Sequence, residues 1–265
     1  MLVVIRGAGD IATGIALRLW RSGMKLVMLE LPAPTAIRRT VCFSQAVLFG
    51  SWCVEGVTAR LASDANEARQ LAEHGEIAVL VDPDGSAVAA LRPDGVVDAI
   101  LAKRNLGTKL TDAPVVVGVG PGFTAGVDCH AVVETMRGHD LGRVILKGSA
   151  QANTGIPGVI AGHSADRLLR APADGIFRQV REIGDRVNPG DIAAEVAGVP
   201  MCCKLGGTLR GLLADGVPVY KGMKCGDVDP RGVEDYCNRA SDKALAVGGG
   251  VLEAILQLSG VLKER

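Results

Sequence analysis

A glycine-bearing turn near the start of the chain has residue types suited to binding phosphate. The stretch Gly7-Ala-Gly9-Asp10-Ile-Ala12 follows an apolar run and precedes apolar residues at helical spacing. In such a loop the first glycine permits a tight turn, the second lets the backbone approach a phosphate, and the small third position keeps helix and strand close. Asp10 would itself compensate the helix dipole. The pattern therefore has two interpretations, a nucleotide site and a self-capped packing unit.

A second glycine loop and several polar residues fall where further strands should end. Gly118 to Gly126 follows an apolar run, Lys103 and Asn105 follow another, and Arg38 and Arg39 lie just beyond a third. Open α/β sheets bind ligands at the carboxyl ends of their strands, where an acid such as Glu30 reads a ribose hydroxyl. The residues that we predict to bind a cofactor are Gly7, Gly9, Asp10, Ala12, Thr13, Glu30, Arg38, Arg39, Lys103, Asn105, Gly118, Gly120, Gly122 and Thr124.

Three residues after the second glycine loop are candidates for acid–base or metal chemistry. We expect Asp128 to cap a helix on which His130 and Glu134, at positions i and i+4, share one face. Such a set can act as acid and base or bind a metal, although an i,i+4 His/Glu pair is more often a surface or capping pair. We therefore predict no metal site and assign no catalytic residue, and keep these three as the candidates.

The order of apolar runs predicts the elements that must position these residues. Strand-like runs near 2–5, 25–29, 77–81, 96–101 and 114–118 alternate with helical or looped segments. This order predicts an α/β fold, a Rossmann-like parallel sheet domain over residues 1–168. We also expect an edge hairpin over 52–60 and a helix over 64–74 with Ser63 as its N-cap.

An internal duplication predicts a second, all-β domain over residues 169–230. Asp174-Gly-Ile-Phe-Arg178 matches Gly206-Gly-Thr-Leu-Arg210 at an offset of 32 positions. Two interlocking halves of this kind resemble the barrel-sandwich hybrid of biotinyl and lipoyl carrier domains. The hairpin Ala197-Gly-Val-Pro200 lacks the modifiable lysine of those carriers, so we predict no biotin or lipoate attachment.

A C-terminal helical segment is expected over residues 231–265. Ser241 should cap its helix, in which three consecutive glycines, residues 248–250, imply close approach of another backbone or of a ligand, with helix–helix packing the favoured alternative.

Composition excludes several classes of function. The 265 residues carry no net charge at a pI near 6.9, so no electrostatic footprint for nucleic acid or an anionic membrane is present. No apolar run is long enough to span a bilayer, and Met1 leads directly into a strand, so we expect a cytoplasmic protein without a leader. Seven cysteines, of which only Cys202 and Cys203 are adjacent and no two form a CxxC pair, indicate reduced thiols. A homo-oligomer is compatible with the sequence.

Four motifs together resemble the YqeB family of accessory proteins of the selenium-dependent molybdenum hydroxylase system. They are Arg6-Gly-Ala-Gly-Asp-Ile-Ala-Thr-Gly14, Pro34-Thr-Ala-Ile-Arg-Arg-Thr40, Gly120-Pro-Gly-Phe-Thr-Ala-Gly126 with Asp128-Cys-His130, and Ser241-Asp-Lys243 with Gly248-Gly-Gly-Val-Leu-Glu253. The first strand–turn–helix unit also resembles the XdhC/CoxF maturation factors. The resemblance implies maturation of a molybdenum hydroxylase client and handling of a nucleotide or molybdenum-pterin cofactor. It supplies no catalytic residues.

Two other functions stay open at this point. The Rossmann-like pattern is compatible with an NAD(P)-dependent oxidoreductase, although Asp10 weakens that interpretation. A non-enzymatic scaffold that docks a hydroxylase is the third hypothesis. The sequence thus leaves undecided whether the protein is an enzyme.

Overall fold

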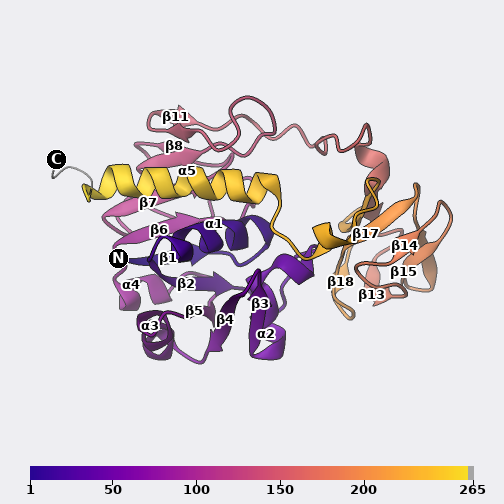
Figure 1. Cartoon of the computed structure of the whole chain (residues 1–265), viewed down its shortest axis with the longest axis horizontal. Helices are drawn as coiled ribbons and strands as arrows, with labels where there is room; N and C mark the ends of the chain where they lie inside the picture. The colour runs from indigo at the N-terminus through magenta and orange to yellow at the C-terminus, as the bar shows by residue number, and fades with distance from the viewer. Residues whose placement is uncertain (262–265) are drawn as a thin grey trace. The chain divides into compact units, whose positions relative to one another are not determined.

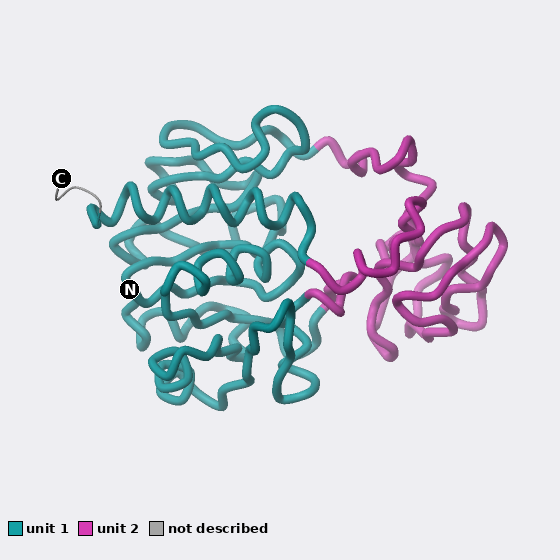
Figure 2. Tube along the Cα trace, viewed as in Figure 1, with its two compact units in different colours: residues 1–34, 42–153, 240–265 teal, residues 35–41, 154–239 magenta. Residues whose placement is uncertain are grey.

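The computed structural model describes residues 1–261, which form two compact units (Figure 2). Unit 1 comprises residues 1–34, 42–153 and 240 onward, and unit 2 comprises residues 35–41 and 154–239. These units differ from the predicted division at residues 168 and 230, because each includes a segment from a distant part of the chain. The C-terminal helix belongs to the α/β unit, and residues 35–41 belong to the β-rich unit.

Unit 1 is built on a nine-stranded, mostly parallel sheet (Figure 1). Its order is β10 (Val144–Ile145), β9 (Ala131–Val133), β7 (Val115–Val119), β6 (Gly95–Asp98), β1 (Leu2–Arg6), β2 (Lys25–Glu30), β5 (Ile77–Val81), β4 (Val57–Ala62) and β3 (Ser51–Val54). Only the pairs β3–β4 and β9–β10 are antiparallel. A separate two-stranded ribbon joins β8 (Thr124–Ala125) to β11 (Gly148–Ser149). The predicted α/β class with a parallel sheet is confirmed.

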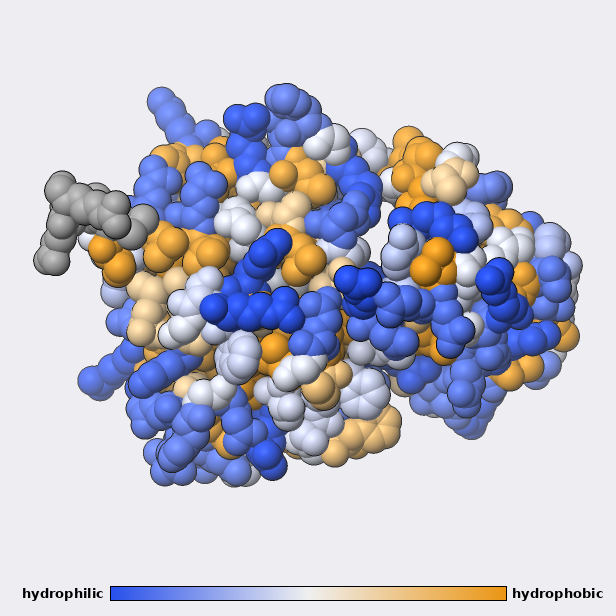
Figure 3. All heavy atoms as spheres, in the orientation of Figure 1, coloured by the Kyte–Doolittle hydropathy of each residue, from blue (hydrophilic) through white to orange (hydrophobic). Residues whose placement is uncertain are grey.

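Helices cover both faces of this sheet because alternate residues of its buried strands point to opposite sides. Helices α1 (Asp10–Arg21) and α5 (Asp242–Ser259) lie side by side on one face (Figure 1). The other face packs α3 (Ala65–Glu73) and α4 (Ala87–Leu91) in one core cluster with Val4 and Val27. Short helices η2 (Phe43–Gln45) and α2 (Ala46–Phe49) follow β2 along the chain. Over α1 and α5, hydrophobic and hydrophilic residues are interspersed on the face drawn in Figure 3.

Glycines allow α1 and α5 to approach closely. A Cβ at Gly14 would lie 2.5 Å from the Ala244 Cβ, and one at Gly248 would lie 2.8 Å from the Gly14 carbonyl oxygen. One at Gly250 would lie 2.1 Å from the carbonyl oxygen of Gly142. The predicted close backbone approach at the glycines of α5 is thus confirmed, and it serves packing of the helix against its neighbours.

Local predictions hold where the signal lies within the element itself. The hairpin of β3 and β4, the strand β5 and the cap of α5, whose Ser241 hydroxyl accepts from Ala244 N at 3.1 Å, are confirmed. The predicted N-cap of α3 is wrong: Asp64, not Ser63, caps this helix, because its Oδ1 accepts from Asn66 N and Glu67 N, both at 2.8 Å. Within residues 1–261, no helix is sufficiently long and apolar to cross a membrane.

Unit 2 consists of two four-stranded sheets around a core that includes Phe177, Leu209 and Val228. One sheet has the order β12 (Leu168–Arg170), β19 (Lys224–Asp229), β17 (Gly207–Leu212) and β14 (Arg186–Val187). The other has the order β16 (Val199–Cys202), β15 (Ile192–Val196), β13 (Gly175–Gln179) and β18 (Pro218–Val219). Two 3₁₀ helices, η3 (Ala165–Arg167) and η4 (Glu234–Cys237), flank these strands.

The duplicated halves of unit 2 interlock with pseudo-twofold symmetry. Strand β13 of the first half pairs with β18 of the second, and β17 of the second pairs with β14 of the first. Backbone hydrogen bonds repeat in the same way: Gly190 N donates to Cys203 O, and Gly222 N donates to Ala171 O, each at 2.9 Å. The assignment of this unit as a barrel-sandwich hybrid stays a prediction.

Candidate functional site

The turn between β1 and α1 has the backbone that its glycines predict. Gly7 has φ +100°, and a Cβ there would lie 3.0 Å from the Ala99 carbonyl oxygen, so only glycine suits this position. Gly9 is the N-cap of α1 and has open space around its Cα, while Asp10 begins the helix and Ala12 is buried.

The protein's own carboxylate occupies the turn, however. Glu30 accepts from Ala8 N at 2.9 Å through one oxygen and from Leu31 N at 2.8 Å through the other. Burial raises the pKa of this carboxyl, and the two N–H donors partly offset that effect. Glu30 was predicted to accept a hydrogen bond from a ribose hydroxyl. It instead accepts from the Ala8 amide, the group that a ligand's phosphate would use.

The start of α1 is also covered by the segment that follows β2. Ser44 N donates to the Ala8 carbonyl oxygen at 2.9 Å, and Phe43 N donates to Thr13 Oγ1 at 2.9 Å. Phe43 is fully buried. The Thr13 hydroxyl, which we predicted to contact a cofactor, therefore fixes this covering segment in place.

A buried polar network fills the switch point of the sheet. At this point β1 has β2 as its neighbour on one side and β6 on the other, so the connections run in opposite directions. Arg6 ends β1 and Asp98 ends β6, with 3.6 Å between Nη1 and Oδ2. The Thr108 hydroxyl donates to Asp98 at 2.6 Å and accepts from Arg6 at 2.5 Å, and Arg6 also donates to the Leu106 carbonyl. An acid within an apolar strand usually has a paired partner or lies at a sheet edge, and the sequence did not identify Arg6 as the partner of Asp98. The ion pair leaves this crevice, where such sheets usually bind ligands, occupied by the chain itself.

The loops after β6 and β7 meet at the same carboxyl edge of the sheet. Gly122 has φ +113°, and a Cβ there would lie 2.7 Å from the Arg104 Cα and 2.9 Å from the Lys103 carbonyl carbon. Leu101 and Lys103 adopt left-handed backbone conformations, with φ +61° and +65°, which cost energy for residues other than glycine. The two loops are thus held together by a backbone contact that only glycine permits.

Polar side chains tie these loops into one structure. Asn105 Nδ2 donates to Asp128 Oδ1 at 3.3 Å and to the Thr108 carbonyl oxygen at 2.8 Å. Asp128 Oδ2 accepts from Thr124 N at 2.7 Å, and the Thr124 hydroxyl is 2.9 Å from that of Ser149. Asn105, from the loop after β6, therefore contacts the segment of the second glycine loop that contains Thr124 and Asp128.

The remaining glycines of the second loop have packing roles. A Cβ at Gly118, within β7, would collide with the Phe123 ring at 2.5 Å. Gly120 has φ +79° and faces the Thr135 hydroxyl, 2.7 Å from the position of a Cβ. Both glycines shape the loop that surrounds Gly122.

Lys103, next to the exposed Arg104, gives this loop region a cationic group. The residue is exposed at the surface, and partial removal of its ammonium from water lowers its pKa. An ammonium beside a glycine loop can bind an anion. The geometry therefore supports anion binding and assigns no catalytic step.

The predicted helix carrying His130 and Glu134 is wrong. The apolar residues between them form β9, which pairs with β7, so a strand replaces the helix and the two side chains share no helical face. His130 Nδ1 accepts from Val116 N at 2.9 Å. The buried Glu134 carboxylate accepts from the backbone amides of Thr135, Met136 and Gln151. Residues 1–261 contain no group of three or more His, Cys, Asp or Glu side chains placed to hold a metal.

Arg38 and Arg39 belong to unit 2 and bind protein groups there. Arg38 is buried and donates to the carbonyl oxygens of Tyr236 and Arg239 at 2.9 and 3.1 Å. Arg39 donates to Leu212 O at 2.7 Å and to Gln179 Oε1 at 2.9 Å. The segment 35–41 is thus a strap on the β-rich unit. Its arginines contact backbone carbonyls where a phosphate was predicted.

The chain is similar to one curated protein over nearly its whole length. It is 56% identical over 257 residues to the uncharacterized protein YqeB of Escherichia coli K12, an alignment that covers 97% of this chain and 48% of that protein. The chain thus spans about half the length of this relative. No family model matches the chain. The identity supports the YqeB family that the four motifs predicted.

The chain also has distant matches among solved structures. The ectoine utilization protein EutE (DoeB) from Ruegeria pomeroyi is 13% identical with a TM-score of 0.25, covering 85% of this chain and 56% of that one. An aspartoacylase family protein from Mesorhizobium loti is 13% identical with a TM-score of 0.27, covering 86% and 84%. TM-scores this low support no conclusion on fold or function.

Proposed function

We propose, from the premise that this is a YqeB-type chain, that it is an accessory protein in the maturation of selenium-dependent molybdenum hydroxylases. In this proposal it holds an anionic part of a nucleotide or molybdenum-pterin cofactor and passes the cofactor to the hydroxylase. The resemblance of the N-terminal unit to XdhC/CoxF factors, a cytoplasmic location and a barrel-sandwich hybrid architecture for unit 2 belong to the same proposal.

One observation carries the cofactor-binding part: the contact of Gly122 with the loop that bears Lys103. The loops after β6 and β7 present a cation, two left-handed non-glycine residues and a glycine turn at one edge of the sheet. Strained backbone of this kind concentrates at ligand-binding loops. Oxygen atoms of a phosphate are suited to the Lys103 ammonium and to nearby backbone amides.

The β1–α1 turn is the weaker part of the predicted site. Its amide at Ala8 is taken by Glu30, and its helix start is covered through Thr13 and Ser44. A nicotinamide dinucleotide would need the Ala8 amide and the start of α1 to be free for its pyrophosphate and ribose. The same geometry therefore disfavours the NAD(P)-dependent oxidoreductase, and we place the cofactor's anion at the loops after β6 and β7.

Calorimetry on matched lysine variants tests the site. Purified protein is titrated with molybdopterin cytosine dinucleotide and with cytidine 5′-diphosphate, using Lys103→Met as the site variant. Loss of a charge-assisted hydrogen bond should weaken binding by about tenfold or more. Lys25→Met is the control, because Lys25 is exposed at the amino end of β2, the opposite edge of the sheet. Absence of binding by the unaltered protein would remove the cofactor-handling proposal.

Co-purification tests the client separately. The tagged chain should retain a molybdenum hydroxylase subunit when both are expressed together. Retention that is the same for Lys103→Met and the unaltered chain, combined with no cofactor binding, would favour the scaffold hypothesis.

A further inference from the structure

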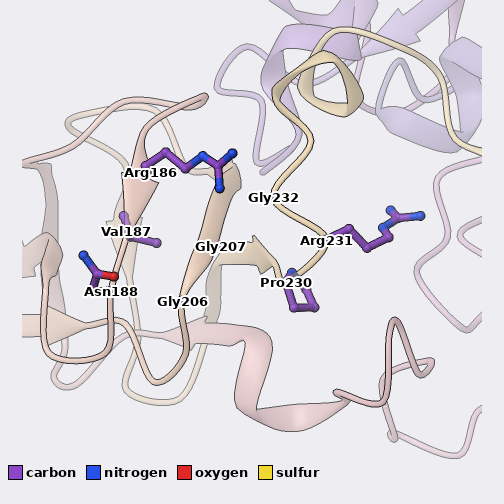
Figure 4. A pocket seen from close by; sticks show the side chains of 8 residues that line it. All are labelled: Arg186, Val187, Asn188, Gly206, Gly207, Pro230, Arg231 and Gly232. Atoms are coloured by element: carbon purple, nitrogen blue, oxygen red, sulfur yellow. The ribbon is translucent and has the colours of Figure 1, made fainter.

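One corner of unit 2 forms an open cavity of about 350 Å³ that the cofactor proposal does not use. Its wall comes from β14, from the start of β17 and from the turn that follows β19 (Figure 4). The lining residues are Arg186, Val187, Asn188, Gly206, Gly207, Pro230, Arg231 and Gly232. In Figure 4 the Arg186 side chain extends toward the turn at Gly232.

The duplication provides an internal comparison for this corner. Shifting by 32 positions maps Gly206 onto Asp174, Gly207 onto Gly175 and Arg186 onto Pro218. The strand pairing follows the same symmetry at this corner, because Gly207 pairs with Val187 as Gly175 pairs with Val219. The symmetry-related corner, which contains Asp174, Gly175, Pro218 and Lys221 and which we call the mate corner, therefore shows what the same backbone does with different side chains.

The mate corner contains an internal carboxylate, and the cavity corner lacks it. Asp174 Oδ1 accepts from Lys221 N at 2.7 Å. In the cavity corner Gly206 replaces that aspartate, and Pro189, which has no N–H, stands where Lys221 would be. The cavity corner has thus lost both the acid and its amide donor.

Cations replace these groups in the cavity corner. Arg186 stands where the mate has Pro218, and no carboxylate among residues 1–261 pairs with it. Arg231, which also lines the cavity, shares Asp229 with Arg210, and Arg210 shares Asp227 with Arg167.

A buried hydroxyl without a hydrogen-bond partner lies next to this corner. Thr208, which lies opposite Arg186 in the ladder of β14 and β17, has an Oγ1 with no hydrogen-bond partner among the described residues.

We propose that this corner binds an oxyanion of the phosphate class. The anion occupies the place that the Asp174 carboxylate has in the mate corner, with Arg186 as its principal charged partner. A planar guanidinium pairs with two oxygens of a phosphate at once, which gives such a site its selectivity. The site is separate from the loops after β6 and β7, so either proposal can fail without the other.

Amide NMR with inorganic phosphate tests the proposal on the full chain. A Lys103→Met background removes the proposed site of unit 1 from the titration. The amide signals of Gly206, Gly207 and Gly232 should shift with a saturable curve. Those of Gly175 and Lys221, in the mate corner, should stay unchanged.

Two variants should weaken binding in different ways, one by removing a positive charge and the other by adding a negative charge. Arg186→Ala removes the cation, and Gly206→Asp supplies the missing internal carboxylate. A Cβ at Gly206 would lie 3.5 Å from Val187 O and 3.9 Å from Pro189 Cδ, so the backbone tolerates it. Each should raise the apparent dissociation constant about tenfold or more. Arg178→Ala is the control, because Arg178 is exposed, pairs with Asp215 and lies outside the cavity lining.

The titration and the two variants together give outcomes that either support or overturn the proposed phosphate site. Saturable shifts confined to the cavity corner and lost in both variants support the proposal. Equal shifts in both corners, or unchanged binding in Gly206→Asp and Arg186→Ala, overturn it. Thermal melting of each variant shows whether it is folded, and Arg186→Gln replaces Arg186→Ala if the latter is not.

Discussion

At the scale of single residues, Glu30 shows how an internal carboxylate can take the place of a ligand. Its oxygens accept from the Ala8 and Leu31 amides at the position where a glycine turn usually binds phosphate. The arrangement has a cost, because burial disfavours the charged form and raises the pKa of the carboxyl. The consequence can be measured as a dependence of stability on pH.

Glu30→Gln should flatten that dependence. The folded-state pKa of Glu30 lies above its ordinary value of 4.5, so its favourable contribution is fully present below pH 4.5 and is lost as the pH rises through the folded-state pKa. Glutamine does not titrate and still offers a carbonyl to Ala8 N. The melting temperature of the variant minus that of the parent should therefore rise between pH 4.5 and 7. A difference that falls over this range would contradict the assignment.

At the scale of elements, the glycines of α5 determine how closely it packs. A Cβ at Gly250 would lie 2.1 Å from the Gly142 carbonyl oxygen, whereas a Cβ at Gly249 meets nothing within 4 Å. Gly250→Ala should lower the free energy of unfolding by about 1–3 kcal/mol through overpacking. Gly249→Ala, the matched control, should raise it by about 0.8–1 kcal/mol through helix propensity. Urea denaturation of both variants measures the contrast, and equal effects would refute the packing.

The strap of residues 35–41 makes a second prediction at this scale. Arg39→Ala removes hydrogen bonds to Leu212 O and Gln179 Oε1, each from a charged donor. The free energy of unfolding should fall by about 1.5–3 kcal/mol. Lys204→Ala, an exposed substitution in the same unit, should have little effect. Because Arg39 binds protein groups, its loss should leave cofactor affinity unchanged, and a weakened cofactor affinity would restore its predicted phosphate role.

The elements that could be predicted from sequence are those whose signal is local. Apolar runs and caps identify β1, β5, α1 and α5, and the 32-residue repeat identifies unit 2 as a duplication. The helix expected to carry His130 and Glu134 failed because β9 pairs with β7, a tertiary contact that overrides i,i+4 spacing.

The predicted site was only partly recoverable for the same reason. The sequence indicated that Asn105 and Thr124 follow strands, but it assigned Asp128 to a helix cap and did not predict the contacts among these three residues. The hydrogen-bond partners of Glu30, Arg38 and Arg39 could not be predicted from the sequence, because each depends on where a backbone group from another segment lies. Sequence spacing indicates which side chains reach the edge of a sheet, but it does not show which protein groups already satisfy them.

At the scale of the whole molecule, each unit takes segments from both sides of residues 151–156. Unit 1 needs α5, and unit 2 needs the strap. All six residues of this stretch are exposed, so an inserted protease site there should be cleaved. The nicked protein should give two bands on a denaturing gel and one peak of unchanged volume in size-exclusion chromatography. Separation of the two fragments without denaturant would contradict the exchange of segments.

The strap also constrains how the chain can fold on the ribosome. Arg38 donates to the Tyr236 carbonyl, which follows it by 198 residues. At typical translation rates the arginine emerges roughly 10–40 s before that partner. During this interval the nascent chain carries α1 without the helix that covers it. Both units reach their final form only after Tyr236 and α5 have emerged, and nascent-chain chaperones have time to bind the exposed apolar surface.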